Sequence, residues 1–383
     1  MNRPLFGIGA VVLLCACGDP TTVPFVGEDG PIPVAITAGS EHTCALDSEA
    51  VAWCWGRNAS GQLGVGGTDH GPSPAVIAGG HSFALLDGGF EHTCGIDTSG
   101  NAWCWGDNSF GQLGDGSTSS RDVPTRVSGL PAVIGISSGA LHTCARTEAG
   151  ALYCWGENRS GQLGDGSTDD QTEPVRVPNF VATSVDAGLR TTCAGDTDGL
   201  IHCWGDNEDG LIHGSADSVH LEPTPLPLVP LAVEVEVGQN HACAAGLDNR
   251  TYCWGSNAAG QHGQGTVDPV SSVSPVIGFL PFGLIESSAR SRHTCGAAQG
   301  TFYCWGANED AQIRVGDDII PRPVPIRILG IFVDAATGRV HSCTLEQSGG
   351  IICWGENRWG QLGFGPANFG QSGFGPRRVE LPR

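Results

Sequence analysis

Cysteine is the reactive residue type that this sequence spaces most regularly. Fourteen of its sixteen cysteines form seven pairs, six of them ten positions apart and one nine. The pairs are Cys44 and Cys54, Cys94 and Cys104, Cys144 and Cys154, Cys193 and Cys203, Cys243 and Cys253, Cys295 and Cys304, and Cys343 and Cys353. Even numbers of regularly spaced cysteines are typical of disulfides in exported proteins. We therefore predict seven local disulfides that stabilise the fold.

Zinc binding is the main alternative chemistry for these thiols. Structural zinc sites use clustered ligands, with the two cysteines of a pair two to four residues apart. A hairpin explains the longer spacing better, because a three-residue turn over residues 98–100 would place Cys94 opposite Cys104. Such a turn needs a left-handed residue in last position, usually glycine. Gly100 satisfies this need, whereas Ala50 in the first pair predicts a strained or different turn.

The first residues predict export and attachment to a lipid. Arg3 precedes an apolar run from Leu5 to Leu14, and the string Leu14-Cys15-Ala16-Cys17 resembles the lipobox of bacterial lipoproteins. We expect a signal peptide over residues 1–16, lipidation at Cys17 and a flexible tether over residues 17–33. Gly18 favours the outer membrane or cell surface over the inner membrane. Signal cleavage without a lipid is the alternative.

Other residues with chemical potential have structural explanations. Histidine recurs at one position of the repeat, where a single threonine, Thr191, replaces it; the histidines are His42, His92, His142, His241, His293 and His341. One histidine per repeat cannot converge on one metal ion, so we expect hydrogen-bonded core residues. The string Gly135–Gly139 has the form G-x-S-x-G, but a nucleophile elbow requires a strand that turns into a helix. We predict no catalytic, cofactor or metal residues.

The elements that position these residues belong to a repeat of about 50 residues. The second cysteines follow one another in steps of 50, 50, 49, 50, 51 and 49 residues. Short runs rich in Val, Ile, Thr, Tyr and Trp divide each copy into four strands; in the fourth copy they are 174–177, 182–186, 191–195 and 200–204. Four strands per repeat are typical of a β-propeller blade. We predict seven four-stranded antiparallel blades over residues 34–383, with residues 377–381 closing the ring by completing the first blade.

Two further residue types recur once per repeat and are predicted to be structural. The tryptophans are expected between blades; they are Trp55, Trp105, Trp155, Trp204, Trp254, Trp305 and Trp354. The asparagines are expected to cap the following loop; they are Asn58, Asn108, Asn158, Asn207, Asn257, Asn308 and Asn357.

The combined motif, H-T-C-A-L…C-W-G-x-N-x-x-G-Q-L-G, resembles the regulator of chromosome condensation repeat. The resemblance covers about residues 34–383 and implies a seven-bladed propeller. The eukaryotic founder of that family is a nuclear nucleotide-exchange factor that also touches chromatin. Export and acidity argue against carrying those activities over, because a net charge of −21 repels phosphate backbones. We expect a monomer with no nucleic-acid partner, and contact with a membrane through the N-terminal lipid only.

Variable loops are the predicted contact sites, because loops on a rigid scaffold carry most binding residues. The loops that leave the cysteine hairpins differ most between copies. Their candidate contacts are Phe110, Trp359, Phe364, Phe369 and Phe374, with Asp206 and Asp209 as a second choice or a weak cation site. The alternative for the glycine-rich last loop is that it folds back and plugs the shaft, burying its phenylalanines.

Three function classes are consistent with these features. The first is a binding module of the bacterial cell envelope that holds a protein or glycan. The second is a structural surface lipoprotein without a specific ligand. The third is a polysaccharide-acting enzyme, which would need two carboxylates at a defined separation. The first class is favoured, and no cofactor is expected.

Overall fold

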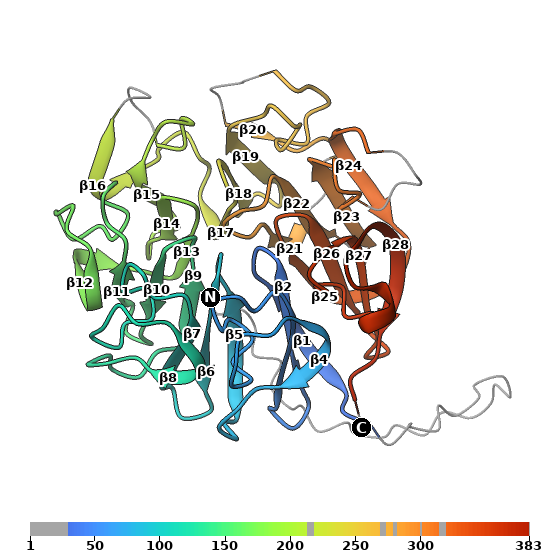
Figure 1. Ribbon diagram of the computed structural model, residues 1–383. Coiled ribbons are helices and arrows are strands. Elements are labelled where there is room, and N and C mark those ends of the chain that lie inside the picture. The colour runs from blue at the N-terminus through green and yellow to red at the C-terminus, as the bar shows by residue number, and fades with distance from the viewer. Residues whose placement is uncertain are drawn as a thin grey trace, which may run out of the picture.

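The described residues form seven four-stranded antiparallel sheets arranged around a centre (Figure 1). The structure, a computed structural model, describes residues 30–212, 218–268, 273–278, 282–298, 301–313 and 319–382. Each sheet is one blade, and the blades are numbered 1 to 7 along the chain. The predicted all-β, seven-bladed propeller is therefore confirmed.

Two strands of each blade lie closest to the central shaft. The innermost strands are β1 (Pro33–Ala38), β5 (Phe83–Gly88), β9 (Gly135–Ser138), β13 (Ser184–Ala187), β17 (Ala232–Val237), β21 (Phe282–Glu286) and β25 (Phe332–Thr337). The second strands are β2 (His42–Asp47), β6 (His92–Asp97), β10 (His142–Arg146), β14 (Thr191–Gly195), β18 (His241–Gly246), β22 (His293–Ala298) and β26 (His341–Glu346).

The other two strands lie toward the rim. The third strands are β3 (Ala52–Gly56), β7 (Ala102–Gly106), β11 (Ala151–Gly156), β15 (Ile201–Asp206), β19 (Thr251–Gly255), β23 (Thr301–Gly306) and β27 (Ile351–Asn357). The outer strands are β4 (Gly71–Val76), β8 (Arg121–Arg126), β12 (Gln171–Val181), β16 (Val219–Pro225), β20 (Ser274–Pro275), β24 (Arg322–Ile328) and β28 (Gln371–Val379). One short 3-10 helix, η1 (Pro366–Asn368), precedes β28.

The predicted order of strands within a blade was displaced by one strand. Residues 174–177 were expected to pair with the hairpin that follows them, but they belong to β12, which pairs with β11 of the preceding hairpin. The same displacement affects the C-terminus. Residues 377–379 lie in β28, which completes blade 7 by pairing with β27, so their assignment to blade 1 was wrong.

Side-chain packing, and not a shared strand, closes the ring between blades 7 and 1. Val379 of β28 lies in one buried cluster with Ile36 and Trp55 of blade 1. The backbone N–H of Ile36 also donates to Asp334 Oδ2 of blade 7 at 3.0 Å. The C-terminal strand therefore contributes apolar surface to the closing seam while it pairs within its own blade.

The cysteine pairs lie opposite one another on the second and third strands of each blade. All seven predicted pairs have their sulfur atoms at bonding distance, 2.02–2.14 Å. The cysteines are buried in the apolar clusters between blades. Gly100 has the expected left-handed backbone, with φ at +82°, and Ala50 adopts the same conformation at +64°. The first hairpin therefore keeps the common turn and carries the strain.

Tryptophan and asparagine hold each loop to its own blade and to the next one. Every repeat tryptophan donates its indole N–H, at 2.8–3.0 Å, to a backbone carbonyl in the preceding blade, usually that of the Gly-Gln-Leu-Gly glutamine. Every repeat asparagine accepts, on Oδ1, the backbone N–H five residues later at 2.7–3.0 Å. Both predicted roles, packing between blades and loop capping, are observed.

The histidines form a second set of contacts between blades. Six of them place Nε2 at 2.7–3.0 Å from a hydroxyl of the next blade, as His92 does with Thr143. The seam between blades 4 and 5 lacks both partners, because Thr191 replaces the histidine and Ala242 replaces the hydroxyl residue. There, buried Val237 lies against Gly188, where the histidine ring lies in other blades. An apolar contact thus replaces the polar one.

Candidate functional site

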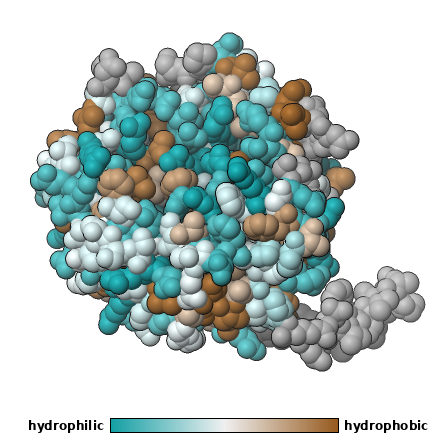
Figure 2. Space-filling view, in the orientation of Figure 1, coloured by the Kyte–Doolittle hydropathy of each residue, from teal (hydrophilic) through white to brown (hydrophobic). Residues whose placement is uncertain are grey.

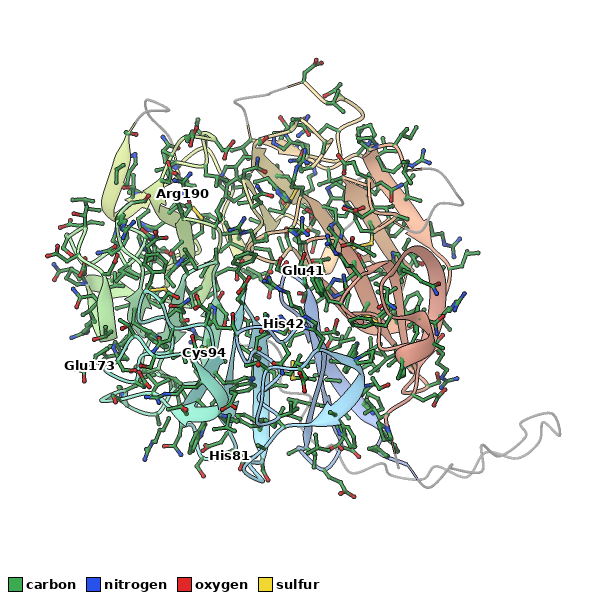
Figure 3. The ribbon with its side chains drawn as sticks, viewed as in Figure 1. Glu41, His42, His81, Cys94, Glu173 and Arg190 are labelled. Carbon is green, nitrogen blue, oxygen red and sulfur yellow. A yellow bond between two sulfur atoms is a disulfide. The ribbon has the colours of Figure 1, made fainter. Side chains whose placement is uncertain are left out.

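One face of the ring, here called the loop face, carries two kinds of connection between strands. It consists of the turns that join innermost to second strands and the loops that follow the third strands. Glu41, in one such turn, lies toward the centre, whereas Glu173 lies at the rim (Figure 3). Because strand direction alternates, these turns and loops lie on the same side, and the loops carry Phe110, Trp359, Phe364 and Phe369.

Trp359 and Phe369 come together around His70, at the junction of blades 7 and 1. The ring centroid of His70 lies 4.7 Å from that of Trp359 and 6.3 Å from that of Phe369. The guanidinium carbons of Arg57 and Arg358 lie 5.9 and 5.1 Å from the centroid of Trp359. Phe369 is 41% exposed. These five side chains, here called the aromatic–arginine cluster, join two positions that the sequence singled out with three that it did not.

His70 is anchored within this cluster. Its Nδ1 accepts the backbone N–H of Asn58 at 3.0 Å. Its pKa is lowered, first by partial burial and then by the positive charge of Arg57. The imidazole is therefore neutral near pH 7, and it packs as an aromatic ring between Trp359 and Phe369.

The glycine-rich last loop does not plug the shaft. Its helix η1 packs beside β4, the outer strand of blade 1, and Gly365 donates its N–H to Pro72 O at 2.8 Å. In Figure 1, η1 lies away from the centre. Phe364 packs partly buried against the closing seam, so it supports the loop. The side chain of Phe374 lies outside the described residues; its backbone is paired with Gly355.

The remaining predicted contacts lie elsewhere on the loop face. Phe110 of blade 2 is half-buried, and Arg159 of blade 3 lies 5.2 Å from its ring centroid. Asp206 and Asp209 line one shallow depression at the seam of blades 4 and 5. Arg190 lies 3.1 Å from Asp206, so part of this acidic charge is neutralised. The pKa of Asp209 is raised, mainly by reduced contact with water and then by Glu208.

A chain of ion pairs crosses from blade 7 to blade 2 near the shaft mouth. Arg339 pairs with Glu41, Glu41 with Arg57 at 3.4 Å, and Arg57 with Glu91. Glu41 is buried, because the two guanidinium groups compensate its charge. These alternating charges give the inner part of the loop face a fixed electrostatic pattern.

The described residues provide little for metal or nucleophilic chemistry. Among them, no group of three His, Cys, Asp or Glu residues is placed to hold a metal ion. Gly135–Ser138 forms β9, an innermost strand, so the G-x-S-x-G string has no nucleophile-elbow geometry. The visible surface is largely hydrophilic, with apolar residues in separate patches (Figure 2). Within this part of the chain, no helix is long and apolar enough to cross a bilayer.

The repeat motif also matches known families. The regulator of chromosome condensation (RCC1) repeat matches residues 99–146 and 149–194, and a second form of it matches 34–62, 83–112, 133–162, 182–211 and 232–261. The chain carries RCC1 repeats and folds as a seven-bladed propeller.

Curated relatives share short segments with the RCC1-repeat propeller described here. The human probable E3 ubiquitin-protein ligase HERC4 is 42% identical over 65 residues, which are 16% of this chain and 6% of the ligase. Human protein RCC2 is 31% identical over 83 residues, 21% of this chain and 16% of RCC2. The matches thus span less than a fifth of these relatives.

Solved structures are similar over most of the ring. A chain in the crystal structure of Kap60 bound to yeast RCC1 (Prp20) has a TM-score of 0.77 and 20% identity, with 92% of this chain and 85% of that chain covered. Human WBSCR16 has a TM-score of 0.75 and 20% identity, covering 84% of this chain and 88% of its own. At this identity the likeness establishes the fold alone.

Proposed function

We propose that this RCC1-repeat propeller is a non-enzymatic binding protein that holds a protein partner on its loop face. The observation that carries the proposal is the aromatic–arginine cluster. Trp359 occupies a position that is Ser60 in blade 1 and Ser160 in blade 3, so the fold does not require an aromatic there. Tryptophan and arginine are the residues most enriched among the energetically dominant contacts of protein interfaces.

A protein suits this cluster better than a glycan. Sugar-binding platforms offer a free aromatic face, whereas His70, Arg57 and Arg358 already lie against the indole of Trp359. The cluster therefore presents guanidinium donors beside a partly exposed Phe369. This mixture matches the apolar and charged composition of a protein interface.

The setting that we propose is the bacterial cell envelope. The support is the sequence of residues 1–17, which lies outside the described residues, together with seven buried disulfides, which persist in oxidising compartments. Lipidation at Cys17 and a tether before residue 34 would hold the ring near a membrane with its faces free. Detergent partitioning of the exported protein and of Cys17→Ala tests this arrangement; wild-type protein wholly in the aqueous phase would contradict it.

Capture of partners from envelope extract tests the binding function. The bait is the soluble ring, residues 30–383, and the variant is Trp359→Ala with Phe369→Ala. The matched control is Leu329→Ala with Ile331→Ala, which removes apolar groups that are more exposed than Phe369, at 71% and 66%, from the opposite face. We expect the cluster variant to lose the captured protein at unchanged melting temperature, while the control keeps it. Capture that survives the cluster variant would place the partner on another surface.

A further inference from the structure

The turn that enters the shaft mouth from blade 6 is longer than its counterparts. Eight positions separate Ile285 from His293, whereas six separate Ile36 from His42 in blade 1, although both strands keep the same register to the cysteine hairpin. The two additional residues are ordered by hydrogen bonds. Ser291 donates its backbone N–H to Ser288 O and accepts the N–H of Gln239 on its own carbonyl, both at 2.8 Å.

Arg290 lies in this longer turn and reaches across the shaft mouth. Its guanidinium carbon is 4.0 Å from the ring centroid of Phe90, which belongs to the equivalent turn of blade 2. Blades 6 and 2 are separated by two blades on one side of the ring and three on the other. The contact therefore spans the centre of the loop face, and the partly buried Phe90 acts as a platform for the cation.

The charge of Arg290 lacks the carboxylate partner that its neighbours have. Arg57, Arg339 and Arg190 each form an ion pair. Among the described residues, no carboxylate is paired with Arg290, and its Nε is buried without a hydrogen-bond partner. Burial lowers its pKa, with Arg339 acting in the same direction. A partly buried guanidinium whose charge is not paired with a carboxylate is stabilised by an anion that reaches its terminal nitrogens.

We propose that the shaft mouth is a carboxylate-binding site, with Arg290 as the ligand-binding residue and Phe90 as the group that orients it. A planar guanidinium matches the two oxygens of a carboxylate in a bidentate pair. A monoanion is favoured over phosphate, because the negative charges of Glu41 and Glu91 act on Arg290 and the whole chain carries a net charge of −21. The natural source would be an Asp or Glu side chain of the partner, and this last step alone rests on the proposed function.

Nuclear magnetic resonance of arginine side chains tests the site without any partner. The disulfide-bonded ring is labelled with 15N-arginine, and its Nε–H signals are followed during titration with acetate and with N-acetylglutamate at constant ionic strength. Arg290→Gln assigns the Arg290 signal by its disappearance. We expect a saturable shift of that signal, and no saturable shift of Arg176, which is exposed on the outer strand β12 and belongs to neither proposed site. Absence of saturation at Arg290 would overturn the proposal.

Two variants and one competing anion sharpen this test. Arg290→Lys keeps the charge but not the bidentate geometry, and Phe90→Leu removes the aromatic platform; we expect each to weaken acetate binding at least fivefold. Arg176→Gln should leave it unchanged. Inorganic phosphate that binds more tightly than acetate would overturn the assignment to carboxylates. Carboxylate binding together with intact partner capture by the Trp359 and Phe369 variant would instead reject the proposed interface and leave this site standing.

Discussion

At the scale of single residues, Ala50 shows how strongly the repeat imposes its turn. Its counterparts Gly100, Gly150, Gly199 and Gly349 have φ of +78° to +83°, and Ala50 is held at +64° in the same position. A left-handed conformation costs an alanine roughly 1 kcal/mol relative to glycine. The disulfide of Cys44 and Cys54 and the surrounding ladder offset this cost.

Exchanging alanine and glycine at these turns should therefore shift stability in opposite directions. We expect Ala50→Gly to raise the free energy of unfolding by about 0.5–1 kcal/mol. Gly199→Ala is the matched change, because an added Cβ there meets no atom closer than 3.5 Å and only the backbone conformation is penalised. It should lower stability by a similar amount. Chemical denaturation measures both, and equal signs for the two variants would contradict the explanation.

Asp186 is a half-buried acid whose ionisation opposes folding. Its Oδ1 accepts the hydroxyl of Ser137 at 2.7 Å, and its Oδ2 accepts the N–H of Val237 at 2.6 Å. Burial nevertheless raises its pKa from 3.8 to about 7, with a smaller contribution from Asp87 in the same direction. The folded state thus prefers the protonated acid.

The pH dependence of stability should show this preference. A raised pKa in the folded state gives stability that is present below pH 3.8 and is lost as pH rises through about 7. Asp186→Asn cannot ionise, so its stability relative to wild type should increase between pH 5 and pH 8. Parallel denaturation curves of the two proteins across this range check the sign. A constant difference would mean that Asp186 is ionised throughout.

At the scale of elements, the contacts between neighbouring blades depend on one hydroxyl that serves two partners. Thr143 of β10 donates to Gln112 O at 2.9 Å and therefore accepts from His92 Nε2 at 3.0 Å. His92 is fully buried in β6. Removal of the hydroxyl leaves a buried imidazole N–H without a partner, whereas Gln112 O keeps the indole N–H of Trp155.

A double-mutant cycle tests this coupling. Thr143→Val keeps the shape of the side chain and should cost about 1–3 kcal/mol of stability, the usual penalty for an unpaired buried polar group. In a His92→Leu background the same change should cost less, because no imidazole remains to be left unpaired. The seam of blades 4 and 5 supports this expectation, since both partners are absent there together. Additive losses would show that the two residues act separately.

The repeat predicted the elements well and their grouping poorly. The cysteine hairpins, the inter-blade tryptophans and the capping asparagines follow from spacing alone. The grouping failed because the short connection from residues 174–177 to residues 182–186, which leads from β12 into β13, was interpreted as a turn within one blade. In the structure the short links pass between blades, and the long loops, such as 57–70, stay within one. The pattern of apolar residues cannot distinguish these two kinds of connection, because a strand buries similar side chains whichever of the neighbouring strands it pairs with.

The candidate site was predictable only in part, for a similar reason. Trp359 stood out because its position is small or acidic in every other repeat except the second, which has Phe110, and Phe369 stood out as an aromatic in a glycine-rich loop. His70 and Arg57 come from a different repeat, and no local pattern indicates which side chains of neighbouring blades meet. The sequence contains one signal for Arg290, which is the two additional residues before His293. This signal becomes informative only once the turn is known to reach across the shaft.

At the scale of the whole molecule, the buried histidines between blades make the stability of the whole ring sensitive to acid. Burial lowers the pKa of five of the six repeat histidines to about 3, and that of His92 to about 4. All six are neutral in the folded ring near pH 7. Five of the hydroxyls that face them also donate to the backbone carbonyl of a glutamine, in the loop that follows the third strand of the preceding blade. Protonation at any one seam therefore disturbs the contact of two blades.

The ring should consequently unfold cooperatively in mild acid. A lowered pKa in the folded state gives stability that is present above pH 6.5 and is lost as pH falls toward 4 and 3. Each such histidine contributes a slope of up to about 1.4 kcal/mol per pH unit, so several together outweigh the opposite effect of the single Asp186. We expect the melting temperature to fall steeply between pH 6 and pH 4, with the disulfides intact. His92→Gln, which cannot be protonated, should show a shallower fall, and a melting temperature that is constant down to pH 4.5 would mean that the seams do not control stability.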